Sequence, residues 1–254
     1  MKIFVISNFL AHLEILDKVQ HLIKKVIPDI IIFTGNIVLP GERRKEWELS
    51  QSTGKRARRN LDKIVKEIEN NRNIVHQFLT TLSLTGVPSL FIPGKNDAPL
   101  YEISKELESF DTIIQNIHQA KTERDGFLFL GYGGGIFSTI SDDISENYFV
   151  NIYTYNMLKY KLRRFKFSLL PKILVFHSCP TLPMFNNNNV QHEICGDLNS
   201  VFNYFSPDIL ITSGVSNPDI DFLENCWVIN PGSLALGNAC IFDTKKHDFK
   251  KLEL

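Results

Sequence analysis

The sequence has few cysteines and no excess of charge of either sign. Its 254 residues include four cysteines, and 28 basic residues balance 28 acidic ones. The cysteines are widely spaced, form no C-x-x-C pair and lie in or beside apolar stretches, which is typical of reduced thiols in a cytosolic protein. The balanced charge gives no global field toward nucleic acid or an anionic membrane, so we expect neither as a partner.

The sequence also lacks a long hydrophobic run. No apolar stretch approaches the about 20 residues that a membrane span needs, and Asn8 and His12 interrupt any signal-like stretch near the start. We therefore expect a cytoplasmic protein. A chain of this length can bury a full core without disulfides or a structural metal.

Short β-branched runs alternate instead with segments of helical period. We expect strands at 2–7, 30–34, 87–92, 112–117, 127–130, 172–176 and 208–212, and helices at 13–26, 61–82 and 100–110. This alternation is typical of βαβ units around a parallel or mixed sheet. It predicts one α/β domain over residues 1–254, ending in antiparallel strands at 227–230, 239–243 and 249–254. The glycine run 131–135 lacks the spacing of a phosphate loop, so we expect a turn there.

One charged, glycine-punctuated stretch, at about 41–73, breaks the alternation and reads as an insertion. Glutamates at 42, 46 and 48 are interleaved with its basic cluster, which consists of Arg43, Arg44, Lys45, Lys55, Arg56, Arg58 and Arg59. This favours a solvated helix pair with internal ion pairs over contacts to RNA or nucleotide phosphates. Trp47 is a candidate packing or homo-oligomer contact. A further hypothesis places the protein's function in this insertion and treats the rest as scaffold.

Polar or glycine-rich groups follow five of the expected strands. They are Asn8, Asn36, the turn Gly94-Lys95-Asn96-Asp97, His177 and Gly214. Ligands of α/β sheets bind past the carboxyl ends of strands, so these groups are the candidate site.

The order and context of these groups, with Asn230-Pro231-Gly232-Ser233 downstream, resemble the calcineurin-like metallophosphoesterase family over nearly the whole chain. The family pattern is Asp-x-His, Gly-Asp, Gly-Asn-His-Asp/Glu, a lone His and Gly-His-x-His. The resemblance implies an α/β fold of two facing mixed β-sheets flanked by helices, with a dinuclear metal centre that hydrolyses phosphate esters.

Carried over residue by residue, most of the family's metal ligands are replaced in this chain. The seven ligand positions are Asn8, Leu10, Asn36, Lys95, His177, Val215 and Asn217, of which only His177 keeps a ligand side chain of the family. The family's catalytic His falls on Asn96, and Asp97 keeps its family identity. The candidate catalytic residues are therefore Asn96, Asp97 and His177.

These replacements change the charge of the whole site. Two divalent cations need anionic oxygens, whereas Asn8 and Asn36 offer neutral carbonyls and Lys95 adds a positive charge. We expect no metal cofactor. A divalent metal such as Mn or Zn is expected only if the protein is active.

The same side chains suit an anion such as a phosphate or a carboxylate. The expected ligand-binding residues are Asn8, Asn36, Lys95, Asn96, His177 and Asn217. Lys95 supplies charge, while the amides and the glycine turn supply N–H donors. The competing interpretation is that these residues hydrogen-bond one another and that Lys95 pairs with Asp97.

Two functions follow from the sequence. The first is a catalytically silent family member that binds a partner or a small molecule containing phosphate, such as a nucleotide-like anion. The alternative is a phosphoesterase with an altered single-metal site, or a metal-free one in which Lys95 stabilises transition-state charge.

Overall fold

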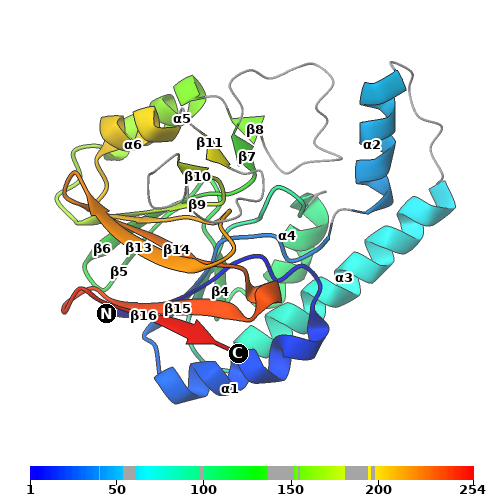
Figure 1. Ribbon diagram of the computed structural model, residues 1–254, viewed down its shortest axis with the longest axis horizontal. Coiled ribbons are helices and arrows are strands. Elements are labelled where there is room, and N and C mark those ends of the chain that lie inside the picture. The colour runs from blue at the N-terminus through cyan, green and yellow to red at the C-terminus, as the bar shows by residue number, and fades with distance from the viewer. Residues whose placement is uncertain are drawn as a thin grey trace.

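Two six-stranded β-sheets face one another, with helices on both outer surfaces (Figure 1). This computed structural model describes residues 1–39, 41–53, 61–97, 100–136, 152–153, 155–180, 194–195 and 198–254. The arrangement confirms the expected fold class of two facing mixed sheets flanked by helices.

The first sheet has the strand order β16-β15-β1-β2-β3-β4. Its strands are β1 (Lys2–Ile6), β2 (Ile30–Phe33), β3 (Ser89–Phe91), β4 (Ile114–Asn116), β15 (Asn238–Asp243) and β16 (Asp248–Glu253). β1 to β4 are parallel, whereas β15 runs antiparallel to both of its neighbours. The carboxyl ends of β1, β2 and β3 therefore meet at one edge of the sheet.

The second sheet has the order β13-β14-β12-β9-β6-β5. Its strands are β5 (Lys121–Arg124), β6 (Phe127–Tyr132), β9 (Lys172–Phe176), β12 (Ile209–Ile211), β13 (Pro218–Leu223) and β14 (Cys226–Pro231). The four inner strands are parallel, and the edge strands β5 and β13 are antiparallel to their neighbours. Two short ladders pair β7 (Gly135–Ile136) with β8 (Ile152–Tyr153), and β10 (Cys179–Pro180) with β11 (Ile194–Cys195).

The structure corrects three points about the strands. The glycine run is a turn only at Gly133 and Gly134, because Gly131 continues β6 and Gly135 starts β7. β14 pairs in parallel with β12 as well as antiparallel with β13, so the C-terminal strands do not form one antiparallel unit. The edge strands β5 and β13 were not expected at all.

The inner strands bury both of their faces, which explains their continuous apolar sequences. On β1, Ile3 and Val5 belong to the cluster between the two sheets, while Phe4 and Ile6 belong to the cluster beneath the helices. Successive side chains of a strand point to opposite faces, so each apolar strand contributes to two layers of core.

Helices cover the outer face of each sheet (Figure 1). The first sheet is covered by α1 (Leu16–Val26), α3 (Leu61–Ser83) and α4 (Leu100–Glu108), and the second by α5 (Tyr155–Leu162) and α6 (Leu198–Phe205). Short 3-10 turns are η1 (Leu13–Ile15), η2 (Arg163–Phe165) and η4 (Leu234–Leu236). Among the described residues, no helix is both long and apolar enough to cross a bilayer.

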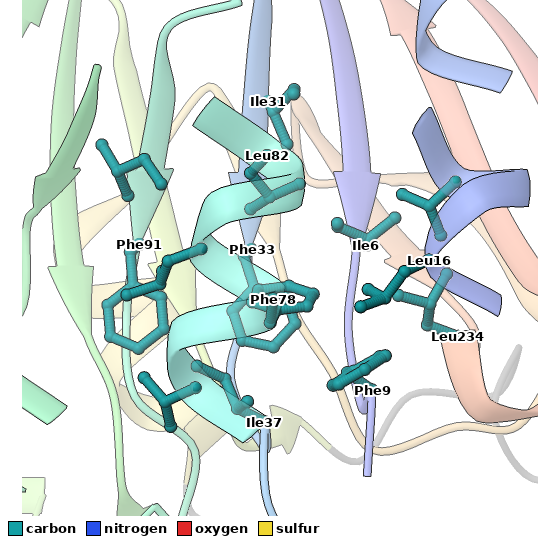
Figure 2. Close-up of a cluster of buried hydrophobic side chains, with 14 of the residues drawn as sticks. Ile6, Phe9, Leu16, Ile31, Phe33, Ile37, Phe78, Leu82, Phe91 and Leu234 are labelled. Carbon is teal, nitrogen blue, oxygen red and sulfur yellow. The ribbon is translucent and has the colours of Figure 1, made fainter. Parts of the chain in front are cut away.

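Phe78 of α3 anchors the helical layer to the first sheet (Figure 2). Its ring centroid lies 4.7 Å from that of Phe33 on β2 and 4.8 Å from that of Phe9, which follows β1. All three rings are buried. Loss of such a ring typically costs about 3 to 5 kcal/mol, so this contact fixes the strand ends beside it.

The described residues of the expected insertion, 41–53 and 61–73, form α2 (Glu42–Thr53) and the first part of α3, and α2 lies beside α3 and away from the sheets (Figure 1). Internal ion pairs join Arg44 to Glu48 and Lys45 to Glu42, as expected for a charged helix. Arg43 is different, because its Nε lies 3.0 Å from Glu67 Oε1 on α3 and both side chains are about nine-tenths buried. This pair ties α2 to the body of the protein.

Candidate functional site

The polar residues expected at strand ends lie together beside the carboxyl ends of the parallel strands of both sheets. Asn8 follows β1, Asn36 follows β2, the Gly94–Asp97 turn follows β3, and His177 follows β9 of the facing sheet. A hydrogen bond between His177 Nδ1 and the carbonyl of Thr34, at 2.6 Å, joins the two sheets there. The sequence-based prediction of one cluster therefore agrees with the geometry for these four segments.

Two glycines allow the turns after β2 and β3 to touch. A Cβ on Gly94 would lie 2.1 Å from Asn36 N and 2.2 Å from Asn36 Oδ1. A Cβ on Gly35 would lie 2.2 Å from Gly94 N, and Gly35 has φ +99°. No other residue fits these positions without moving the backbone.

The two asparagines sit in the left-handed backbone region, with φ 54° for Asn8 and φ 63° for Asn36. Asn and Asp tolerate this region better than most residues because their short side chains bond locally. An Asn in place of an Asp therefore keeps the backbone conformation while it removes a charge.

The amides of Asn8 and Asn36 form a directed chain of hydrogen bonds. The backbone N–H of Asn96 donates to Asn36 Oδ1 at 3.1 Å, Asn36 Nδ2 donates to Asn8 Oδ1 at 2.9 Å, and Asn8 Nδ2 donates to Ser213 Oγ at 3.0 Å. A backbone N–H can only donate, so the first bond fixes which atom of Asn36 is the oxygen. The orientation of Asn8 then follows from that of Asn36.

The direction of these hydrogen bonds leaves unused N–H donors on the side chains of Asn8 and Asn36. Both amide oxygens already accept a hydrogen bond, while each NH₂ group carries two N–H bonds and uses one of them. Among the described residues, the second N–H of each amide has no partner. The pair consequently offers hydrogen-bond donors, which suit an anion better than a cation.

Two serines complete the network and were missed in the sequence. Ser7 Oγ and Ser213 Oγ are both fully buried and lie 2.5 Å apart, bridging the ends of β1 and β12. Ser233, in the Asn-Pro-Gly-Ser segment, donates from Oγ to the carbonyl of Asn8 at 3.4 Å. The position of Ser7 and Ser213 directly after apolar strands was the one available signal, and hydroxyl residues are common at such places.

Asp97 holds the turns together. It is fully buried, and its carboxylate accepts backbone N–H bonds from Gly94, Asn36, Ile37 and Val38 at 2.7, 2.8, 2.8 and 3.2 Å. These recorded donors are all main-chain groups, so the expected pairing of Asp97 with Lys95 finds no support among them. The candidate catalytic role of Asp97 has no support in this geometry either, because both oxygens are occupied.

Burial raises the pKa of the Asp97 carboxyl, and the surrounding N–H donors and His177 act in the opposite direction. Four donors converging on two oxygens match the ionised form, which only accepts. The buried negative charge of Asp97 is thus offset by the backbone.

His177 is buried and points between the sheets. Its Nδ1 faces the Thr34 carbonyl, which can only accept, so Nδ1 carries the proton. In the neutral ring, Nε2 is then the nitrogen with the lone pair. This is the tautomer in which an imidazole serves as a metal ligand or a base.

The remaining predicted positions lie differently. Val215 is buried in the cluster beneath α5 and α6, and Asn217 is exposed, with no recorded hydrogen bond to the Asn8–Asn36 pair. Leu10 has φ 51° and donates its backbone N–H to the Asn36 carbonyl, so it contacts the site through its main chain. Lys95 is half-buried in the turn that carries Asn96.

The donors at this site do not fit a pair of divalent cations. Within the described residues, no group of three or more His, Cys, Asp or Glu side chains could hold a metal ion. The amide oxygens of Asn8 and Asn36 point at other protein groups, and the Asp97 oxygens point at the backbone. A dinuclear centre needs several carboxylates and imidazoles, whereas His177 is the imidazole that these strand ends contribute.

Comparison with known proteins agrees with the fold. The family model described as "Metallophosphoesterase, calcineurin superfamily" matches residues 1–254. No curated protein matches the chain in sequence.

Solved structures are similar over nearly the whole chain. One crystal structure is 22% identical, with a TM-score of 0.88 and coverage of 99% of this chain and 98% of the other. The protein TT1561 of Thermus thermophilus is 21% identical, with a TM-score of 0.76 and coverage of 99% and 98%. A dimetal phosphatase from Danio rerio is 9% identical, with a TM-score of 0.58 and coverage of 95% and 91%. Identities this low show a shared fold and nothing finer.

Proposed function

Because the chain belongs to the metallophosphoesterase family of the calcineurin superfamily, we propose that it is a family member without metal-dependent hydrolysis whose strand-end site binds a phosphate-like anion. Here the strand-end site means Asn8, Asn36, Lys95, Asn96 and His177. The observation that carries the proposal is the direction of the amide chain, which uses both Asn oxygens and leaves N–H donors.

The charge of the site supports the same conclusion. Asp97 is enclosed by main-chain donors, so its negative charge is offset locally. Lys95 adds a cation in the adjoining turn, and a buried or half-buried ammonium is stabilised by a nearby anion. A phosphate would gain a charge partner and several N–H donors at once.

The test is the binding of inorganic phosphate, measured by isothermal titration calorimetry on the wild type and on Asn36→Asp. The substitution adds a negative charge and removes an N–H donor, so we expect at least a tenfold loss of affinity, or about 1.4 kcal/mol. Asn217→Asp is the matched control, because it makes the same change in charge at an exposed position outside the network. Equal affinity in wild type and Asn36→Asp would contradict the proposal.

A second candidate is a phosphoesterase with an altered site, and the tautomer of His177 favours it. The Nδ1 bond to Thr34 leaves Nε2 with its lone pair, as a single-metal site would require. Metal analysis of the purified protein and hydrolysis of an aryl phosphate with Mn²⁺ or Zn²⁺ separate the two candidates. Stoichiometric metal with metal-dependent turnover would establish the hydrolase and overturn the silent site. In a metal-free enzyme, Lys95→Ala should abolish turnover.

A further inference from the structure

A polar cavity lies at the outer face of the second sheet, where α5 and η2 meet the end of β6. It has a volume of about 290 Å³ and is lined by Gln119, Tyr132, Tyr160, Lys161, Arg163 and Arg164, and we refer to it as the basic pocket. Tyr132 ends β6 and its side chain belongs to the cluster beneath α5 and α6. His177 points the other way, toward Thr34 of the facing sheet.

Among the residues that the structure describes, the lining of the basic pocket has three cations and no carboxylate. It belongs to a segment of the sequence with no Asp or Glu between Glu146 and Glu193, although the chain as a whole is neutral. Within the described residues, Arg163 and Arg164 have no carboxylate at ion-pair distance. No described carboxylate therefore offsets the positive charges of these two arginines.

Aromatic and amide contacts position these cations. The Arg163 guanidinium lies 5.4 Å from the ring centroid of Tyr160, and that of Arg164 lies 4.6 Å from the ring of Phe165. Lys161 Nζ donates to Gln119 Oε1 at 2.9 Å, which joins two segments that line the pocket. Aromatic faces orient a guanidinium without cancelling its charge, so the fork remains available to an anion.

The positive charges of the pocket act on the pKa values of two neighbouring groups, His118 and Tyr132. The pKa of His118, next to Gln119, is lowered to about 4, by burial first and by the charge of Lys161 second. Burial raises the pKa of Tyr132 to about 12, against the influence of Arg164. Tyr132 therefore keeps its hydroxyl proton at neutral pH and adds no negative charge to the pocket.

We propose that the basic pocket is a second ligand site, which binds a compact phosphorylated small molecule carrying at least two negative charges. Two planar guanidinium groups and one ammonium match phosphate oxygens. A volume of about 290 Å³ lies at the small end of ligand pockets, which suits a pyrophosphate-sized group better than a polymer. This inference does not depend on the function proposed for the strand-end site.

Titration with inorganic pyrophosphate tests the inference. In a Lys95→Gln background, which weakens anion binding at the strand-end site, the protein should bind pyrophosphate saturably with one site, and adding Arg163→Gln/Arg164→Gln should weaken this binding at least tenfold. Both arginines are exposed, so their loss should leave the thermal unfolding midpoint nearly unchanged. Lys159→Gln/Lys166→Gln is the matched control, because it removes the same charge from the same segment outside the pocket lining. An equal loss in the control would show a non-specific effect of charge and overturn the site.

Two further arms separate this site from other sources of anion binding. If Lys95→Gln abolished pyrophosphate binding and the double arginine variant did not, the ligand would sit at the strand ends, which would overturn the basic pocket and leave the first proposal intact. Phe167 and Leu169 nearby are 87% and 101% exposed. Binding to phosphatidylserine vesicles with no response to pyrophosphate would identify a lipid surface and contradict a small-molecule site.

Discussion

The strand-end site and the basic pocket differ in how their charges are offset. Tyr132 of the basic pocket lies beneath α5 and α6, whereas His177 of the strand-end site contacts Thr34 of the facing sheet. At the strand ends, amides and hydroxyls satisfy one another, and the one enclosed carboxylate is surrounded by main-chain donors. In the basic pocket, three cations lie together, and the described part of the chain places no carboxylate in the lining. The first region lacks the charges that metals need, whereas the second accumulates a charge that a ligand would offset.

The two regions also differ in how rigidly their side chains are held. The strand-end turns are in backbone contact and are held by Asp97, so their geometry can persist without ligand charges. The two arginines of the basic pocket are exposed and are positioned by the faces of aromatic rings. We therefore expect substitutions at the strand ends to change stability most, and substitutions in the basic pocket to change binding with little effect on stability.

The largest effect is expected for Gly94→Ala. The new Cβ would meet the main chain of Asn36 at 2.1 Å, so two turns must separate, at a cost of about 4 to 5 kcal/mol. Urea unfolding measures the loss. Gly86→Ala is the control, since Gly86 has φ +69° and open space, and it should cost only about 1 to 2 kcal/mol. Similar losses in the two variants would show that the turns are not in tight contact.

Asp97→Asn should cost about 3 to 4 kcal/mol in the same measurement. It replaces one acceptor oxygen by an NH₂ group that faces main-chain N–H donors, and it weakens the other bonds by removing their charge. Asp221→Asn is the control, because Asp221 accepts one exposed bond from Phe222. A small effect at Asp97 would mean that this carboxylate is not the support of the turns.

The pH dependence of stability tests His118, which links the two regions. Gly133 N donates to His118 Nδ1 at 2.9 Å, a bond that only the neutral ring accepts. The pKa of His118 is about 4 in the folded protein, below its ordinary value of 6.5. Between these two pH values the unfolded chain binds a proton at His118 and the folded protein does not, so acidification favours unfolding. Stability from this group is complete above pH 6.5 and falls by about 3 kcal/mol as the pH approaches 4.

His118→Gln keeps an acceptor for Gly133 but cannot titrate. The difference between wild type and variant, measured by denaturation at pH 7, 5.5 and 4, isolates the histidine from the carboxylates. The variant should lose less stability than the wild type over this range. Parallel curves would contradict the lowered pKa of His118.

The smallest effect is expected for Asn8→Asp/Asn36→Asp. Two adjacent carboxylates should destabilise the metal-free protein by about 1 to 2 kcal/mol, because like charges repel and both positions are partly or fully buried. Added Mn²⁺ should restore the thermal midpoint of this variant and leave that of the wild type unchanged. Asn203→Asp/Asn217→Asp carries the same charge at exposed positions and should not respond to Mn²⁺. A wild-type response as large as that of the variant would show that the native site holds metal.

The sequence predicted the apolar layers well. The strand at 172–176 and the helix starting at Leu61 match the structure, since continuous β-branched runs and helical periodicity are strong local signals. The edge strands β5 and β13 were missed because β5 is polar and β13 begins with a proline and carries two aspartates, so both take their conformation from pairing with β6 and β14. The strand in the glycine run was missed for the same reason: Gly131 pairs with Val175 although glycine favours no strand.

The candidate site was predicted in outline. Side chains after parallel strands must share one edge, so Asn8, Asn36 and the Gly94 turn could be grouped from the sequence. Asn217 could not be placed, because its loop is exposed and no repeating pattern fixes it. The contributions of Ser7 and Ser213, which are 206 positions apart in the chain, depend on a contact between two sheets.

The sequence by itself determined which charges are present at the strand ends, because folding brings side chains together without changing their chemistry. Compared with the family pattern, Asn replaces Asp at positions 8 and 36 and Lys replaces Asn at position 95, so ligands that a pair of metal ions needs are missing from the sequence itself. Only the tertiary structure decided the direction of the amide bonds, since a main-chain N–H of Asn96 orients Asn36 and through it Asn8. It also gathered Gln119 and Tyr132 with the cations of residues 161–164, through contacts between segments distant in the chain that no local pattern encodes.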